Sequence, residues 1–152
     1  MTEKLKQDIQ KELAFLLPGY GFSEDTTISW LAESENQVFL IKDPAKSDSY
    51  VARVNSGRLV YHTQQMIESE MVWLQALEKH PNVTVPVVLV DNQGKTVHSL
   101  NVASSENTRF VSVYSFLPGT EMPEDNLHSV FQTLGKVTSA LNDHSKTWIT
   151  PE

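Results

Sequence analysis

The sequence contains no cysteine. This excludes disulfide bonds, thiolate metal sites and a thiol nucleophile, and it is typical of a reducing compartment, so we expect a cytoplasmic protein. Long apolar runs are also missing, and the first residues, MTEKLKQDIQKEL, are too polar for a signal peptide. We therefore expect neither a secretory leader nor a membrane span.

Positive charge is scarce. The 12 Lys and Arg residues face 19 Asp and Glu residues, which gives a net charge of −7. This balance argues against a nucleic acid or an anionic membrane as partner. An acidic protein can still bind ATP where a local cation and Mg²⁺ offset its field.

Motifs for metal-dependent or serine-dependent chemistry are missing as well. The five histidines show no HExxH or paired spacing, and Ser112 and Ser115 lie in no GxSxG motif. We therefore predict no metal site and no hydrolase activity. The histidines are His62, His80, His98, His128 and His144.

Hydrophobic patterning indicates one α+β domain with a mainly antiparallel sheet of five to six strands and one inserted helix. An N-terminal helix precedes the sheet, and a C-terminal helix follows a Pro-Gly linker. Pro86 makes its strand either an edge strand or one with an irregular start, and the strand after it is the expected hairpin partner. The predicted helices are 3–17, 63–79 and 124–144, and the predicted strands are 27–31, 37–42, 50–54, 84–90, 96–100 and 109–116.

The stretch 49–77 organises the chain. On its helix the residues that recur at i, i+3, i+4, i+7 and i+10 should form the buried face. Glu70 is the misfit, because a carboxylate turned inward needs a partner. Trp73 falls just off this face, and we expect it to seal the edge of the sheet. The face consists of Ile67, Glu70, Met71, Leu74 and Leu77.

Arg53 is the candidate partner for Glu70. Strand alternation puts Tyr50, Ala52 and Val54 on one face and Val51 with Arg53 on the other. An arginine in a strand beneath a helix that carries an inward glutamate would form a charge-assisted pair. In kinase-type enzymes such a pair holds the cation against the phosphates of ATP. The alternative is that both residues are ordinary surface residues with a structural role only.

Five local matches in the same order resemble the small nucleotide-binding lobe of the aminoglycoside phosphotransferase and choline kinase-like family, which has the protein kinase-like fold. In order, they correspond to the family's strand with the phosphate-binding cation, its helix, its VP strand and turn, and its hinge. The last one corresponds to the first helix of the family's second lobe. The matching segments are YVARV, IESEMVWLQAL, VTVPVVLVDNQG, VSVYSFLPG and LGKVTSALNDHS.

The resemblance implies a nucleotide site for ATP with Mg²⁺. Arg53 takes the place of the family's strand cation and Glu70 that of its helix partner. Ser34 and Asn36 would lie in the loop over the phosphates, and Val38 and Val51 would contact the base. Backbone groups of Ser115 and its neighbours Tyr114 and Phe116 would meet the adenine edge.

The sequence departs from the family pattern at several places. The cation is Arg where the family often has Lys, and the two are not interchangeable. The loop 32–36 has no glycine to bring backbone amides close to phosphate. The helix position where the family often has His is Asn142. No HxD catalytic loop and no later metal-binding Asp follow, so we assign no catalytic residue and expect this chain alone to be inactive.

Three hypotheses follow. The first is the N-terminal lobe of a small-molecule phosphotransferase, with a nucleotide-binding lobe at 1–116, a hinge at 117–123 and the first helix of a missing second lobe at 124–152. The acceptor would be a hydroxyl of an amino sugar, amino alcohol or homoserine. The second is a non-catalytic binding module that dimerises through Phe131 and Leu134. The third is an unrelated α+β domain.

Overall fold

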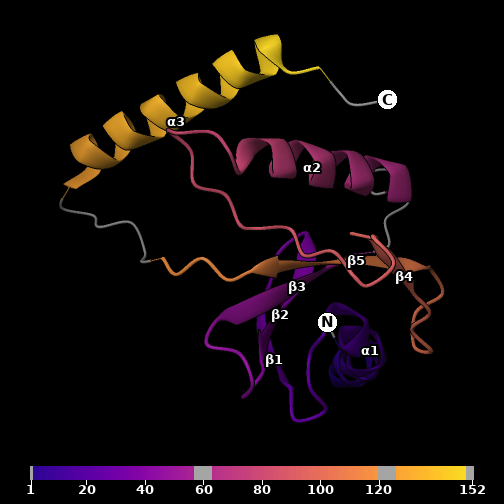
Figure 1. Ribbon diagram of the computed structural model, residues 1–152. Coiled ribbons are helices and arrows are strands. Elements are labelled where there is room, and N and C mark those ends of the chain that lie inside the picture. Colours follow the sequence, from indigo (N-terminus) through magenta and orange to yellow (C-terminus); the bar gives the residue numbers. More distant parts are fainter. Residues whose placement is uncertain (1, 57–62, 120–125, 150–152) are drawn as a thin grey trace.

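The computed structural model describes residues 2–56, 63–119 and 126–149. Within them, a five-stranded antiparallel sheet has the order β1-β2-β3-β5-β4. Helix α1 covers one face of this sheet, α2 covers part of the other, and α3 lies beyond α2 (Figure 1). The elements are α1 (Glu3–Leu16), η1 (Leu17–Tyr20), β1 (Thr27–Glu33), β2 (Asn36–Lys42), β3 (Ser49–Asn55), α2 (Gln64–Leu77), β4 (His98–Leu100), β5 (Arg109–Ser115) and α3 (Leu127–Thr147).

Helix α1 and the sheet enclose the larger hydrophobic core. Ile9 and Leu13 of α1 are fully buried against Phe39 of β2 and Val54 of β3. The alternation of β2 and β3 explains this, because every second residue of each strand points to the α1 side. The expected division of β3 into two faces is thereby confirmed.

A second core lies between α2 and the opposite face of the sheet. Ile67 and Met71 of α2 pack with Tyr114 of β5 and with Val88 and Val97. The predicted inward face of α2 is confirmed for these apolar positions. Since α2 packs over the β5 side, the outer strands on that face are less covered.

Side-chain caps and two glycines set the limits of the elements. The Thr2 hydroxyl accepts a hydrogen bond from Leu5 N, and the Thr63 hydroxyl accepts one from Met66 N, so both α1 and α2 begin with a capped turn. Gly21 ends η1 at φ 74°, and Gly94 forms a turn at φ 82°. Both backbones lie in the left-handed region that favours glycine.

One predicted strand and one predicted strand pairing are wrong. The segment 84–90 forms only an isolated bridge between Val88 and Tyr114, because Pro86 has no N–H with which to build a ladder. The short β4 pairs with β5 and not with 84–90. The sheet therefore has five strands, the lower of the two expected numbers.

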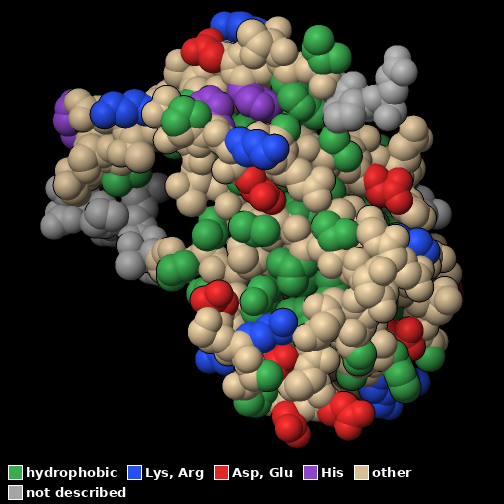
Figure 2. Space-filling model, in the orientation of Figure 1, with side chains coloured by type: hydrophobic (Ala, Val, Ile, Leu, Met, Phe, Trp, Pro, Cys, Tyr) green, Lys and Arg blue, Asp and Glu red, His purple; other side chains and the backbone are tan. Residues whose placement is uncertain are grey.

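Helix α3 ends at Thr147, three residues beyond the predicted end, and none of its described residues is buried. Its predicted start at residue 124 lies outside the described residues, as does most of the predicted hinge. Phe131 is 62% exposed and Leu134 is 56% exposed. Figure 2 shows Lys and Arg side chains scattered among acidic ones on the visible described surface, without one large basic patch.

Candidate functional site

Arg53 and Glu70 form the pair that the sequence predicts. The guanidinium donates from Nη1 to Glu70 Oε1 at 2.7 Å and from Nη2 to Oε2 at 2.6 Å. This parallel geometry is the strongest form of an arginine–carboxylate contact. The Arg53 side chain is 24% exposed and that of Glu70 41% exposed, so the pair lies at the open edge of the α2–sheet interface. Each terminal nitrogen retains a second N–H for another anion.

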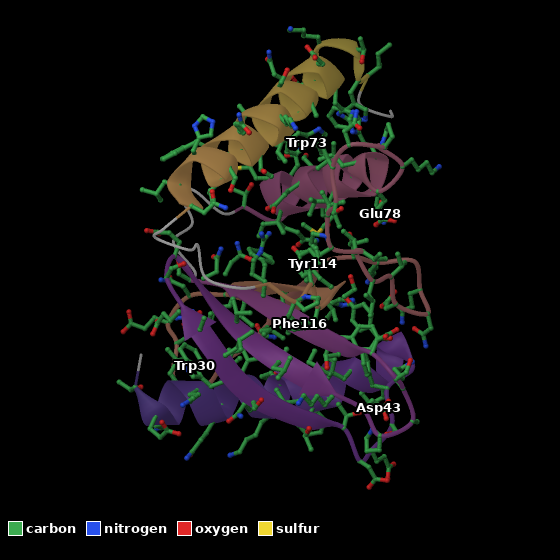
Figure 3. The ribbon with its side chains drawn as sticks, turned by 90° about the vertical axis from the view of Figure 1, so that its left-hand side faces the viewer. Trp30, Asp43, Trp73, Glu78, Tyr114 and Phe116 are labelled. Atoms are coloured by element: carbon green, nitrogen blue, oxygen red, sulfur yellow. The ribbon has the colours of Figure 1, made fainter. Side chains whose placement is uncertain are left out.

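Tyr114 supports the pair from below. The Arg53 guanidinium carbon lies 5.4 Å from the centre of the Tyr114 ring, within the range of a cation–π contact. The Tyr114 hydroxyl hydrogen-bonds Ser112 Oγ at 2.9 Å and lies 3.3 Å from Met71 Sδ. Figure 3 shows Tyr114 between the sheet and α2. Arg53 is thus held in place from two sides, by Tyr114 of β5 and by Glu70 of α2.

The pKa values follow from these contacts. Burial alone would lower the pKa of Arg53, but the hydrogen bonds to Glu70 and the neighbouring charges raise it above its ordinary value. Arg53 is therefore a permanent cation. Burial raises the pKa of Tyr114, so its hydroxyl stays neutral and can donate a hydrogen bond. The site combines a fixed positive charge with a neutral support.

Strand register places the other predicted residues around Arg53 on one face of the sheet. Val38 is the direct β2 partner of Arg53, and Ser112 is its β5 partner. In the next row, Val51 lies between Leu40 and Tyr114. Residues that pair across antiparallel strands share a face. A half-buried apolar surface of Val38, Leu40 and Val51 therefore adjoins the cation.

The predicted phosphate loop is a tight turn at the end of this face. Ser34 is exposed between β1 and β2, and its N–H donates to the carbonyl of Asn36 at 3.2 Å. Asn36 begins β2 opposite Asn55, two residues before Val38. Leu31 interrupts the β1–β2 register and forms a bulge. The turn thus lies on the Arg53 side of the sheet, but it presents no glycine amides.

At the predicted hinge, two of the N–H groups expected to face adenine already have partners. Ser115 N donates to the carbonyl of Val87, and Phe116 N donates to the carbonyl of Ser49, both at 2.9 Å. The Ser115 hydroxyl accepts from Val87 N at 2.8 Å. An adenine edge would therefore have to use other backbone groups of this segment.

Comparison with protein families decides the affiliation. The model of the phosphotransferase enzyme family, APH, matches residues 28–152. The chain belongs to this family. Its fold matches the N-terminal lobe of the protein kinase-like fold. Among curated proteins, none matches the chain significantly.

Two solved structures of small-molecule kinases resemble this APH-family chain. A microcompartment-associated aminopropanol kinase is 32% identical with a TM-score of 0.73, and the match covers 91% of this chain and 41% of that kinase. The amicoumacin kinase hAmiN, in complex with AMP-PNP, Ca²⁺ and Ami, is 22% identical with a TM-score of 0.76, covering 100% and 45%. The second likeness shows the fold alone. The chain spans less than half the length of either kinase.

Sequence reasoning missed one residue of the candidate site in this APH-family chain. Leu40 stands directly opposite Val51 and extends the apolar surface; the alternation of β2 was the available signal, since Leu40 is two residues after Val38.

The described part of the chain shows no group of three or more His, Cys, Asp or Glu side chains that could hold a metal ion. His62 lies outside this part. None of the described helices is long and apolar enough to cross a membrane.

Proposed function

We propose that this chain is the nucleotide-binding lobe of an ATP-dependent small-molecule phosphotransferase, with the first helix of the second lobe attached. The proposed boundaries are those expected from the sequence: the lobe at 1–116, the hinge at 117–123 and the second lobe from 124. The observation that carries the proposal is the bidentate pair of Arg53 and Glu70 beside the half-buried apolar side chains of Val38, Leu40 and Val51.

Arg53 would bind the α- and β-phosphates of ATP through its outward N–H groups, and Glu70 would hold the guanidinium in place. Ser34 and Asn36 would cover the phosphates. Mg²⁺ would arrive with the nucleotide and take protein ligands from the second lobe, because the described residues offer no carboxylate cluster. This chain would therefore position the nucleotide and supply positive charge, whereas the second lobe would supply the catalytic base and the metal ligands.

Adenine would lie on Val38, Leu40 and Val51, with its edge toward the hinge. The exocyclic amine would donate to the Ser115 carbonyl, and the ring nitrogen would accept from Leu117 N–H. Phe116 would border this edge. Tyr114 would act through its position under Arg53 and not through direct contact with the base.

A titration of the 152-residue chain with Mg-ATP, followed by backbone amide shifts, tests this site. We expect shifts at Val38, Val51 and Leu117. Arg53→Ala should weaken binding about tenfold or more, because it removes charge-assisted hydrogen bonds. Lys11→Ala is the matched control: it removes one positive charge from the exposed side of α1 and should leave the affinity unchanged. Shifts confined to α1, or equal losses in both variants, would contradict the proposal.

The acceptor of the intact protein would be the hydroxyl of a small amino compound. Similarity to an aminopropanol kinase at 32% identity favours an amino alcohol over an amino sugar or homoserine. The coding sequence beyond codon 152 tests the whole-protein proposal, which requires an HxD motif, a following Asn and a later Asp. The encoded protein should then consume ATP fastest with amino alcohols in a panel of the three acceptor classes.

A non-catalytic dimerisation module is the second candidate, and the exposed apolar side of α3 favours it. Ser129, Val130, Thr133, Leu134 and Val137 line a shallow groove on this helix, and Phe131 is also exposed. Sedimentation of the 152-residue chain tests the idea. A dimer that Leu134→Glu converts to a monomer supports the module, whereas a wild-type monomer across the concentration range rules it out.

A further inference from the structure

Trp73 and His144 join α2 to α3. Trp73 Nε1 donates to His144 Nδ1 at 3.3 Å across a sequence separation of 71 residues. The His80 ring packs edge-on against His144 at 5.8 Å between centroids, and Trp148 stacks on it at 6.2 Å. Figure 3 shows Trp73 between the two helices, and Figure 2 shows histidine side chains gathered where they meet. The expectation that Trp73 seals the sheet edge is therefore wrong.

This contact is unusual for α3. None of the described residues of α3 is buried. Its other side-chain hydrogen bonds among the described residues stay within the helix or at its N-cap. The aromatic cluster of Trp73, His80, His144 and Trp148 is thus the described polar and aromatic link between α3 and the rest of the molecule.

The position of Trp73 connects this link to the nucleotide site. Trp73 follows Glu70 by three residues, so the two side chains are neighbours along α2. The buried Ile67 and Met71 hold α2 on the sheet, and the hydrogen bond of Trp73 adds a restraint on the same turn of the helix that carries Glu70. Glu70 in turn orients Arg53 through two hydrogen bonds.

We propose that His144 is a positioning residue that locks α2 to α3 and thereby orients Glu70, and that protonation of His144 releases the lock. The inference goes beyond the proposed function, and its test needs no nucleotide. The hydrogen bond from Trp73 requires a lone pair on Nδ1, so the neutral ring carries its proton on Nε2. A protonated ring has two N–H donors and no acceptor.

The surroundings favour release in acid. His80 is the titratable group packed against His144 from outside α3, and two protonated rings at this distance would repel each other. On α3 itself, Asp143 pairs with Lys146 at 3.1 Å, so its charge is balanced next to the ring. Acid should therefore remove the Trp73 acceptor and add repulsion at the same place.

The indole N–H resonance of Trp73 in the full 152-residue chain reports the lock directly. Trp73→Phe identifies this signal, and Trp30, which packs on Phe39 on the other side of the sheet, provides an internal reference. We expect the Trp73 signal to move toward that of a solvent-exposed indole once acid has protonated the His144 ring, because the ring then has no acceptor. The Trp30 signal should hold its position.

Substitutions separate a hydrogen-bond role from mere packing. His144→Phe keeps an aromatic ring but lacks the acceptor, so its Trp73 signal should match the acid form at pH 8. His144→Asn keeps an acceptor at the position of Nδ1 and should restore the locked signal without the pH dependence. His128→Phe is the matched control, since His128 is exposed near the start of α3 and its ring hydrogen-bonds Gln132 of the same helix.

Amide hydrogen exchange of α2 tests the transmission to Glu70. In His144→Phe the amides from Glu70 to Trp73 should exchange about fivefold faster, the factor expected from one lost hydrogen bond, and His144→Asn should restore wild-type exchange. A Trp73 signal that stays fixed through the titration and is the same in wild type and His144→Phe would overturn the lock. Unchanged α2 exchange in His144→Phe would overturn the positioning role.

Discussion

Arg53 is the residue whose surroundings are most specific. It has a carboxylate partner on α2, an aromatic ring beneath it on β5 and an apolar neighbour on β2. Each contact limits the positions that the side chain can take from a different direction. The guanidinium is therefore already in place before a ligand binds. Preorganisation of this kind lowers the cost of ordering a long side chain on binding.

The Arg53–Glu70 pair should contribute modestly to stability. We predict a coupling of about 1 kcal/mol between Arg53→Met and Glu70→Gln, because partly exposed pairs are screened by solvent even when their geometry is good. Urea denaturation of the wild type, the two single variants and the double variant measures it. A coupling of several kcal/mol would mean that the pair serves the fold more than a ligand.

Asp43 gives the fold an acid-sensitive point. Its carboxylate accepts hydrogen bonds from Ser23 Oγ at 2.6 Å, Ser23 N at 2.8 Å and Ala45 N at 2.9 Å. Those from Ser23 contribute most to lowering the pKa of Asp43 below its ordinary 3.8. Because the folded-state pKa lies below the unfolded one, the stabilisation is present above about pH 4 and is lost as pH falls through the lowered pKa.

We therefore expect Asp43→Asn to be less stable than wild type at pH 7 and to lose less stability between pH 5 and 2. Urea unfolding at several pH values measures both differences. Asp48→Asn is the control, since Asp48 lies in the same loop and is exposed. Parallel pH profiles of wild type and Asp43→Asn would contradict the prediction.

At the scale of elements, the glycine-free β1–β2 hairpin is held from behind the sheet. The buried Arg109 of β5 donates to Gln37 Oε1 at 2.8 Å and to Ser105 Oγ at 3.2 Å. Gln37 in turn donates to Glu33 Oε1 at 3.2 Å. This series of hydrogen bonds connects the start of β5 to the end of the hairpin that carries Ser34. The side chains thus stiffen a turn that has no glycine.

Arg109→Ala should cost about 2 kcal/mol of unfolding free energy, because it leaves the buried Gln37 carbonyl without its charged donor. Arg109→Lys should recover only part of this loss, since an ammonium lacks the fork that spans two acceptors. Chemical denaturation measures the costs. Faster amide exchange at Gln37 in both variants, with α1 unchanged, would localise the effect, and uniform loosening would count against a specific tie.

At the scale of the whole molecule, the chain consists of a sheet between two helices and a third helix beyond them (Figure 1). The pair and the apolar surface lie on the sheet face that α2 leaves partly open. The solved kinases that it resembles are more than twice as long. A site with one lined side binds weakly, because much of the ligand surface stays in water.

We predict no ATP-dependent phosphoryl transfer by the purified 152-residue chain. Positioning without a base and metal ligands leaves most of the barrier in place. Transfer of radiolabelled γ-phosphate to amino alcohols, amino sugars and homoserine measures this, with Arg53→Ala as the background control. A turnover that Arg53→Ala abolishes would show that the chain carries chemistry we do not assign to it.

Much of the fold was accessible from sequence because it depends on local patterns. Alternation in β3 separated Arg53 from Ala52 and Val54, and helical spacing brought Glu70 to the inward side of α2. Pairing of the two then required only that the helix lie over the strand. The proposed roles of these residues in nucleotide binding remain predictions, because they came from resemblance and not from geometry.

The sequence by itself determined which strand residues alternate between faces and, within a few residues, where the helices begin and end. It also indicated that Glu70, on an apolar helix face, needs a cationic partner such as Arg53. Only the tertiary structure decided that β4 pairs with β5, that Leu40 lies opposite Val51, and that Trp73 reaches His144 instead of the sheet. The physical reason is that periodicity assigns a residue to a face, whereas the partner on that face depends on packing between segments far apart in the chain.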